Sequence, residues 1–155
     1  MTRVIWIIGV FFILDWGTKR WMDTHLAMYQ LTQVIPGWLS LDLIHNTGAS
    51  FGLLSGDTNL LIRINFSMIL VIIYLYNRFR LNSRLAQIGF SLLISGALGN
   101  LIDRLYFGYV VDFISFYHFP VIFNIADVEI CGGFLLLLSL YLTKRILITK
   151  VNPFE

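Results

Sequence analysis

The chain has few charged residues, 13% of its 155 residues, where soluble proteins have about 25%. Proline is also scarce, with three residues, and no linker or low-complexity stretch divides the chain. By contrast, 57% of the residues are hydrophobic, and the mean hydropathy is +0.77. This composition excludes an ordinary soluble domain. It indicates a single integral membrane domain over residues 1–155.

Cysteine is almost absent as well. Cys131 is the only one, so no internal disulfide can form. Because it lies within an apolar run, we expect a buried side chain rather than a nucleophile. The three histidines show no metal-ligand spacing, and the sequence contains neither His-Glu-x-x-His nor a cysteine pair. We therefore expect no metal.

Four apolar runs approach the length of about 20 residues that a helix needs to cross a bilayer. They cover residues 4–21, 60–76, 85–102 and 128–147. No small-residue cleavage site follows the first run, so we interpret it as a retained span rather than a signal peptide. The pattern predicts an all-α membrane protein with four transmembrane helices.

The distribution of charge predicts the orientation of these helices. The two ends of the chain and the connection between the second and third runs hold seven of the eleven basic residues and only one acid, Glu155. Basic residues in short loops stay in the cytoplasm, so both termini are expected there. The connections 22–59 and 103–127 are then outer loops. The net charge of +2 does not indicate nucleic acid, because clustered basic residues here are topology signals first.

The first outer loop is too long for a simple turn between helices and is expected to fold. Leu39, Leu41 and Leu43 alternate with polar residues, the pattern of a half-buried strand. The dipeptide at 36–37, Pro-Gly, marks a turn before it, and Asn-Thr-Gly at 46–48 marks a turn after it. We expect a small β-sheet in this loop, resting on the outer membrane surface.

Two aspartates, Asp112 and Asp127, lie at the edges of the last two apolar runs. A charged side chain in lipid costs about 2.5–3.5 kcal/mol to insert, so a pair of acids is a functional-site hypothesis. Asp127 alone can be explained as an acid in the first turn of a helix capped by Asn124. Asp112 has no cap or ion-pair partner adjacent in sequence. This favours a shared site in which one carboxyl holds a proton and the other activates water.

Asp15 and Lys19 are one helical turn apart in the first run. We favour a structural ion pair between them over direct catalysis. A Ser/Thr-Lys dyad is the competing interpretation. Thr18 is the sequence neighbour of Lys19 and so projects to a different helix face, which argues against a local dyad.

The third run carries both small and polar positions. Small residues recur every four positions, a stripe typical of close helix packing in lipid: Ser91, Ser95 and Gly99. Gly96, Asn100 and Asp103 share an adjacent face near the outer end. We interpret Asp103, beside Arg104, as a charge-neutralising and orienting element.

Five segments together resemble the signature segments of signal peptidase II, the lipoprotein signal peptidase family, and they occur in the order of that family. They are Asp-Trp-Gly-Thr-Lys at 15–19, Asn-Thr-Gly-Ala-Ser-Phe-Gly at 46–52, Gly-Ala-Leu-Gly-Asn-Leu-Ile-Asp-Arg at 96–104, Val-Val-Asp-Phe at 110–113 and Phe-Asn-Ile-Ala-Asp at 123–127. Ser50 and Ser95 depart from the alanine and glycine common at these family positions.

The resemblance implies a multi-pass aspartic endopeptidase of the bacterial inner membrane, with its active site toward the periplasm. It would remove the signal peptide from prolipoproteins just before the diacylglyceryl cysteine. The catalytic pair would be Asp112 and Asp127. Residues around substrate and dyad would be Asn46, Asn100, Arg104 and Asn124, and supporting residues would be Asp15, Lys19, Gly96 and Asp103. The expected partners are the prolipoprotein and membrane lipids, with no nucleic acid, and the protein is expected to be a monomer.

Two alternatives stay open. One is a small transporter or proton relay that uses Asp103, Asp112 and Asp127. A relay predicts ionisable groups at several depths, whereas nearly all the acids here gather toward one face. The other alternative is a non-catalytic scaffold for lipoprotein handling, in which the two aspartates are dispensable.

Overall fold

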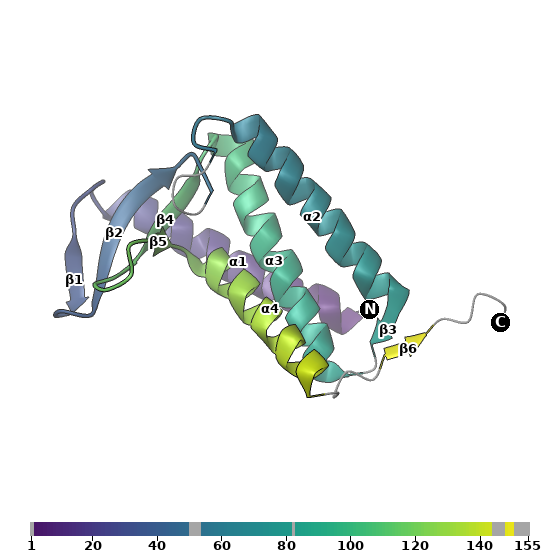
Figure 1. Cartoon of the computed structure of the whole chain (residues 1–155). Coiled ribbons are helices and arrows are strands. Elements are labelled where there is room, and N and C mark those ends of the chain that lie inside the picture. The colour runs from purple at the N-terminus through teal and green to yellow at the C-terminus, as the bar shows by residue number, and fades with distance from the viewer. Residues whose placement is uncertain (1, 50–53, 82, 144–147, 151–155) are drawn as a thin grey trace.

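Four helices make up most of the chain. The computed structural model describes residues 2–49, 54–81, 83–143 and 148–150. The helices are α1 (Thr2–His25), α2 (Thr58–Arg78), α3 (Arg84–Phe107) and α4 (Ile125–Leu142). α3 lies in the middle and packs against the other three (Figure 1). It is the most buried helix, and it carries the polar face predicted from the sequence.

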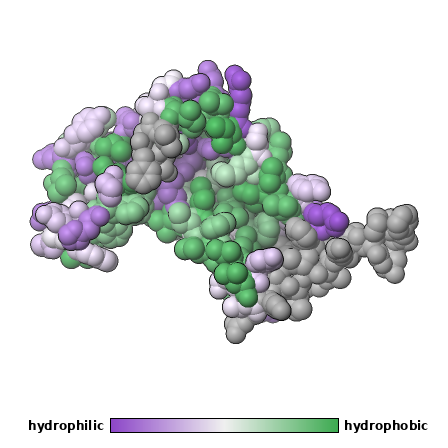
Figure 2. All heavy atoms as spheres, in the orientation of Figure 1, coloured by the Kyte–Doolittle hydropathy of each residue, from purple (hydrophilic) through white to green (hydrophobic). Residues whose placement is uncertain are grey.

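Three helices within the described residues are long and apolar enough to cross a membrane: α2, α3 and α4. α1 has sufficient length but carries five charged residues, which are Arg3, Asp15, Lys19, Arg20 and Asp23. The four-helix expectation is thus supported in part, and the crossing by α1 stays a prediction. Hydrophobic residues cover much of the helix surface in Figure 2, whereas hydrophilic residues gather over the sheet at the left.

The helix boundaries differ from the predicted runs, and the differences in α3 and α4 concern residues predicted for the site. The third run was expected to end at residue 102, but α3 continues to Phe107 and ends at Gly108, which adopts the left-handed conformation with φ 78°. Asp103 and Arg104 therefore belong to the helix rather than to the outer loop, because their charges are satisfied inside the protein. The fourth run was expected over 128–147, whereas α4 begins at Ile125. Residues 144–147 lie outside the described residues.

Small residues bring α3 and α4 close together. A Cβ at Gly96 would overlap the carbonyl of Ala126, and a Cβ at Gly133 would lie 2.6 Å from the carbonyl oxygen of Gly89. Ser91 and Ser95 are fully buried on the same helix. The predicted packing role of small residues in the third run is therefore confirmed. The expectation of a buried Cys131 is wrong, since its side chain is exposed.

The sheet is larger than the sequence predicted. Its order is β1-β2-β4-β5, all antiparallel, with β1 (Thr32–Ile35) and β2 (Leu39–Asn46) from the first connection and β4 (Val110–Phe116) and β5 (Ile122–Phe123) from the second. The strand predicted from alternating leucines is β2. The expectation of a sheet confined to the first loop is wrong. β4 is buried along its first four residues, so apolar residues lie on both of its faces and its sequence lacks the alternation that indicates a strand.

A second, two-stranded sheet lies at the opposite end of the molecule. β3 (Phe79–Leu81) follows α2 directly and pairs antiparallel with β6 (Ile148–Lys150). The N-terminus of α1 lies at the same end (Figure 1). The segments predicted to be cytoplasmic are thus grouped at one end of the helices, away from the larger sheet.

Candidate active site

Asp112 reaches the site from the middle of the larger sheet. Asn46, at the end of β2, pairs in register with Val110 and so lies on the same sheet face as Asp112. The amide Nδ2 of Asn46 donates to Oδ2 of Asp112 at 2.7 Å. Nδ2 of Asn124 donates to Oδ1 at 2.5 Å. The carboxyl group is 2% exposed and receives an amide donor on each oxygen.

Asp127 reaches the same region from the first turn of α4. Asn124 caps this helix: its side-chain oxygen accepts from the backbone N–H of Asp127 at 3.0 Å, and Oδ2 of Asp127 accepts from the backbone N–H of Asn124 at 3.2 Å. The structural explanation of these two residues as a helix cap is therefore confirmed. The cap uses only one oxygen of Asp127. The other, Oδ1, accepts from Nδ2 of Asn100 at 2.9 Å.

Two side-chain amides connect the carboxyl groups. Nδ2 of Asn124 lies 3.3 Å from Oδ1 of Asn100, in addition to its bond to Asp112. A hydrogen-bonded path therefore runs from Asp112 through Asn124 and Asn100 to Asp127. Burial raises the pKa of Asp112 to about 7, and the negative charge of Asp127 adds to this effect, while the amides of Asn46 and Asn124 oppose it.

Lys19 supports this path from α1. Its ammonium group is fully buried and lies 2.8 Å from Asp15 and 3.3 Å from Asp103, and it donates to Oδ1 of Asn100 at 2.9 Å. The ion pair expected between Asp15 and Lys19 is present. Because a cation holds the oxygen of Asn100, the amide nitrogen of Asn100 is directed to Asp127. Oδ1 of Asp15 also accepts from the backbone N–H of Ala126 at 2.8 Å, which satisfies a free donor in the first turn of α4.

Asp103 and Arg104 point in different directions. Asp103 pairs with Lys19 and, at 3.1 Å, with Arg20, rather than with its sequence neighbour Arg104. Adjacent residues on a helix project about 100° apart, so the partner of Asp103 comes from α1. Arg104 donates to the carbonyl of Gly48 at 2.7 Å and to that of Asn100 at 3.3 Å. Within the described residues, its Nε is buried without a hydrogen-bond partner.

The remaining predicted residues are close by. Gly96 provides the close approach of α3 to Ala126, one residue before Asp127, and a Cβ at Gly99 would overlap the carboxylate of Asp15. Residues 50–52 of the second signature segment, Ser50 among them, lie outside the described residues. All ten predicted site residues therefore meet where α3, the start of α4, α1 and the sheet converge.

The sequence analysis did not single out three charged residues near this region. Arg20 joins Asp103 to Asp23 on α1, at 3.1 and 3.5 Å, and its guanidinium lies 4.2 Å from the ring centre of Phe107. Glu129 is 4% exposed, and neither of its carboxyl oxygens has a hydrogen-bond partner within the described chain. The available signals were the i, i+3 spacing of Arg20 and Asp23 and the presence of an acid within an apolar run.

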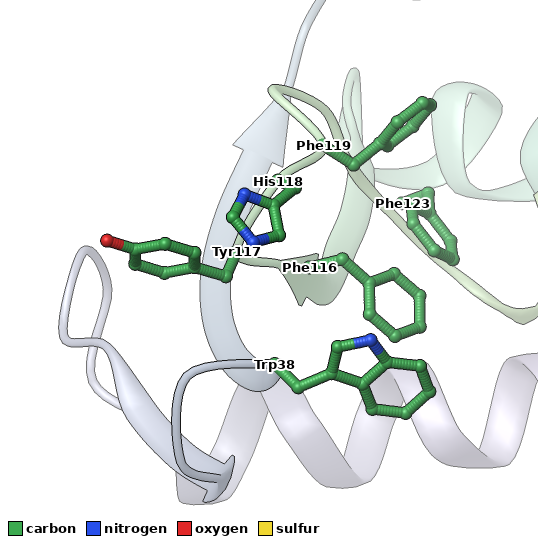
Figure 3. A pocket seen from close by; sticks show the side chains of 6 residues that line it. All are labelled: Trp38, Phe116, Tyr117, His118, Phe119 and Phe123. Atoms are coloured by element: carbon green, nitrogen blue, oxygen red, sulfur yellow. The ribbon is translucent and has the colours of Figure 1, made fainter.

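An open aromatic pocket of about 480 Å³ lies on the sheet, separate from the carboxyl groups (Figure 3). The rings of Trp38, Phe116 and Phe123 pack together, with ring centres 5.2 and 5.7 Å apart. None of the six residues that line it is an acid or an amide. The candidate site is therefore the polar network and not the pocket. The two are adjacent in sequence, because Phe123 of the pocket directly precedes Asn124 of the network.

Comparison with known proteins shows the family. A family model described as signal peptidase (SPase) II matches residues 7–143. The chain belongs to the signal peptidase II family. The lipoprotein signal peptidase of Clostridium novyi is 38% identical over 150 residues, covering 94% of this chain and 99% of the relative. That of Clostridium tetani is 41% identical over 143 residues, covering 89% and 90%.

Solved structures agree with this assignment. A bacterial membrane enzyme determined by the in meso method at 2.3 Å resolution has a TM-score of 0.87 at 34% identity, covering 94% of this chain and 90% of its own. A second such structure, at 1.9 Å, has a TM-score of 0.83 at 34% identity, covering 92% and 94%. Membership of the signal peptidase II family makes the chain a peptidase with membrane helices.

Proposed function

We propose that the chain is an aspartic endopeptidase that cleaves the signal peptide from diacylglyceryl-modified prolipoproteins, just before the lipidated cysteine. The relatives named lipoprotein signal peptidase support this substrate class. The observation that carries the mechanism is the hydrogen-bonded path that joins Asp112 and Asp127 through Asn124 and Asn100. Two acids held in one buried network can share a proton and act on one water molecule.

The two carboxyl groups have different roles in this proposal. Asp127 lies in the first turn of α4, where the helix dipole favours a negative charge, and it serves as the base that takes a proton from water. Asp112, whose pKa is raised to about 7, holds the proton and gives it to the scissile carbonyl oxygen. As the tetrahedral intermediate breaks, Asp127 returns its proton to the leaving nitrogen, and the hydroxyl proton returns to Asp112. No covalent intermediate or cofactor is needed.

The surrounding residues hold this pair in place. Asn46 and Asn124 fix the two oxygens of Asp112, and Lys19 with Asp15 and Asp103 directs Asn100 toward Asp127. Within the described residues the buried Nε of Arg104 has no partner, and it can donate to a substrate carbonyl, while the other two nitrogens donate to the carbonyls of Gly48 and Asn100. These side chains therefore supply hydrogen-bond donors both to the two carboxyl groups and to a peptide substrate.

We also propose that α1 crosses the membrane with the other three helices and that the larger sheet lies at the outer, periplasmic face of the bacterial inner membrane. The exposed apolar side chains of the helices are consistent with lipid around them, as for Trp6, Leu70, Tyr74 and Leu135. A lipid-modified substrate then reaches the site sideways from the bilayer. The protein acts as a monomer.

The test is a cleavage assay with purified protein and a diacylglyceryl prolipoprotein, in which release of the signal peptide is measured. Asp112→Asn and Asp127→Asn should each lower kcat by at least about 10³-fold, because either change removes the acid or the base. Asp57→Asn is the matched control. Asp57 is exposed and accepts from the backbone N–H of Leu60 at the start of α2, a contact that asparagine keeps. Cleavage by both Asn variants at the wild-type rate would show that Asp112 and Asp127 are not the catalytic pair.

A further inference from the structure

We propose that His45 is a positioning residue that, held by Asp23 and Tyr109, fixes Asn46 against Asp112. This inference rests on the proposed function of Asp112. His45 is not among the residues predicted for the site, although it directly precedes Asn46 in β2.

His45 is held from two sides. Its Nε2 lies 2.6 Å from Oδ1 of Asp23 near the end of α1. Its ring stacks on Tyr109, which directly precedes β4, with ring centres 3.9 Å apart and an angle of 13° between the planes. The pKa of the Tyr109 hydroxyl is raised by burial first and by the charge of Asp23 second, so the stacked phenol is neutral at physiological pH.

A β-bulge makes this contact relevant to the site. The register of β2 against β4 shifts between Leu41 and Ile44, where β2 has one residue more than β4. A bulge of this kind turns the following side chains to the opposite face. After it, Asn46 lies on the face of Asp112, and His45 lies on the face toward α1. Without the bulge, Asn46 would point away from Asp112.

Asn46 is the last residue of β2. The last pair of a strand is the first to separate when a ladder frays. Besides the ladder, the contact of His45 with Asp23 ties this strand end to α1. Fixing His45 therefore fixes the backbone that carries the Asn46 amide.

The contacts of His45 are also connected to Asp127 through a series of ion pairs. Asp23 pairs with Arg20, Arg20 pairs with Asp103, and Asp103 pairs with Lys19, which directs Asn100 to Asp127. α1 thus supports Asp112 through His45 and Asn46, and Asp127 through Lys19 and Asn100. A displacement of the outer end of α1 would disturb both acids.

The expected signature is a change in the titration of Asp112. The charged groups that act on it are Asp127 of α4, Lys19 of α1 and Arg104 of α3, and none of them is changed by a substitution at His45. The amide of Asn46 stabilises the ionised form of Asp112. If Asn46 is displaced, Asp112 keeps its proton to a higher pH.

The experiment combines kinetics with infrared titration of the protonated carboxyl band, assigned to Asp112 by its absence in Asp112→Asn. His45→Ala should lower kcat about tenfold with little change in KM. It should also raise the midpoint of the Asp112 band by about half to one pH unit. His45→Gln, whose amide can still reach Asp23, should restore most of the wild-type kcat and most of the wild-type midpoint of the Asp112 band. The control His25→Ala removes another outer histidine, whose contacts within the described residues are with Trp21 and Thr24 of α1, and it should match the wild type.

Asp23→Ala removes the same contact from α1 and decides the result if His45→Ala does not fold. A wild-type midpoint and kcat in the His45→Ala and Asp23→Ala variants would overturn the positioning role. A normal rate of cleavage by Asp112→Asn would instead overturn the proposed function, so the two failures are distinguishable.

Discussion

At the scale of single residues, Lys19 has the most demanding environment. It is fully buried in a chain rich in hydrocarbon and compensates two acids, Asp15 and Asp103, at 2.8 and 3.3 Å. An uncompensated buried charge is costly, whereas removing both partners of a pair costs less than removing one. The contacts of Lys19 therefore contribute to stability as a unit.

We expect Lys19→Met to destabilise the folded protein by about 3–5 kcal/mol, because it leaves Asp15 and Asp103 buried without their cation. Asp15→Asn combined with Lys19→Met should recover part of this loss. Thermal unfolding in detergent measures both. If the double variant is as unstable as the sum of the single variants, the two residues do not act as a pair.

The pKa of Asp112 predicts how the activity depends on pH. Its pKa is raised from 3.8 to about 7, so it is protonated below about pH 7 and ionised above. Because the proposed acid must hold a proton, kcat should fall as the pH rises through about 7. The pH profile of kcat measures this midpoint. A kcat that stays constant from pH 6 to 9 would exclude Asp112 as the acid.

The same shift has a consequence for stability. Between about pH 4 and 7 the folded state keeps a proton on Asp112 that the unfolded chain has lost, so this residue makes the protein less stable as the pH rises through that window. Across this window the melting temperature of Asp112→Asn should therefore fall less, or rise more, with increasing pH than that of the wild type. An equal slope in the variant would show that other groups determine it.

Single residues also show what could be predicted from the sequence. Asp112 and Asp127 were found because an acid in an apolar run is costly, which one sequence reveals. Arg20 and His45 were not, because their partners Asp103 and Tyr109 lie far away in the sequence, and only the fold brings them together. Their importance depends on contacts rather than on local pattern.

At the scale of elements, the spacing of α3 and α4 determines whether Asn100 reaches Asp127. Gly96 permits this spacing because its Cα faces the carbonyl of Ala126. The stripe of small residues on α3 could be predicted from its four-residue spacing in the sequence. The strand β4 was not, since burial on both faces removes the alternation that distinguishes a strand from a helix segment.

We expect Gly96→Ala to destabilise the protein by about 1–3 kcal/mol through overpacking and to lower kcat, because α4 must shift relative to Asn100. Gly132→Ala is the matched control, since a Cβ at Gly132 meets no other atom within 4 Å. Melting temperature and cleavage rate measure the two effects. Similar results for both variants would show that the close approach at Gly96 is not required.

At the scale of the whole molecule, the asymmetry of charge predicted which segments lie together. β3, β6 and the start of α1 lie at one end, and the larger sheet lies at the other (Figure 1). The side of the membrane occupied by each end follows from the distribution of basic residues alone. A direct measurement of this side tests the proposed orientation.

Cysteine labelling supplies this measurement. In a Cys131→Ser background, a cysteine placed at exposed Asp57, at the sheet end, should react with a membrane-impermeant maleimide in intact spheroplasts. A cysteine at exposed Arg84, at the start of α3, should react only after the membrane is broken. Each variant must retain cleavage activity, which serves as the control for folding. The reverse pattern would place the acids on the cytoplasmic side, where a translocated prolipoprotein cannot present its cleavage site to them.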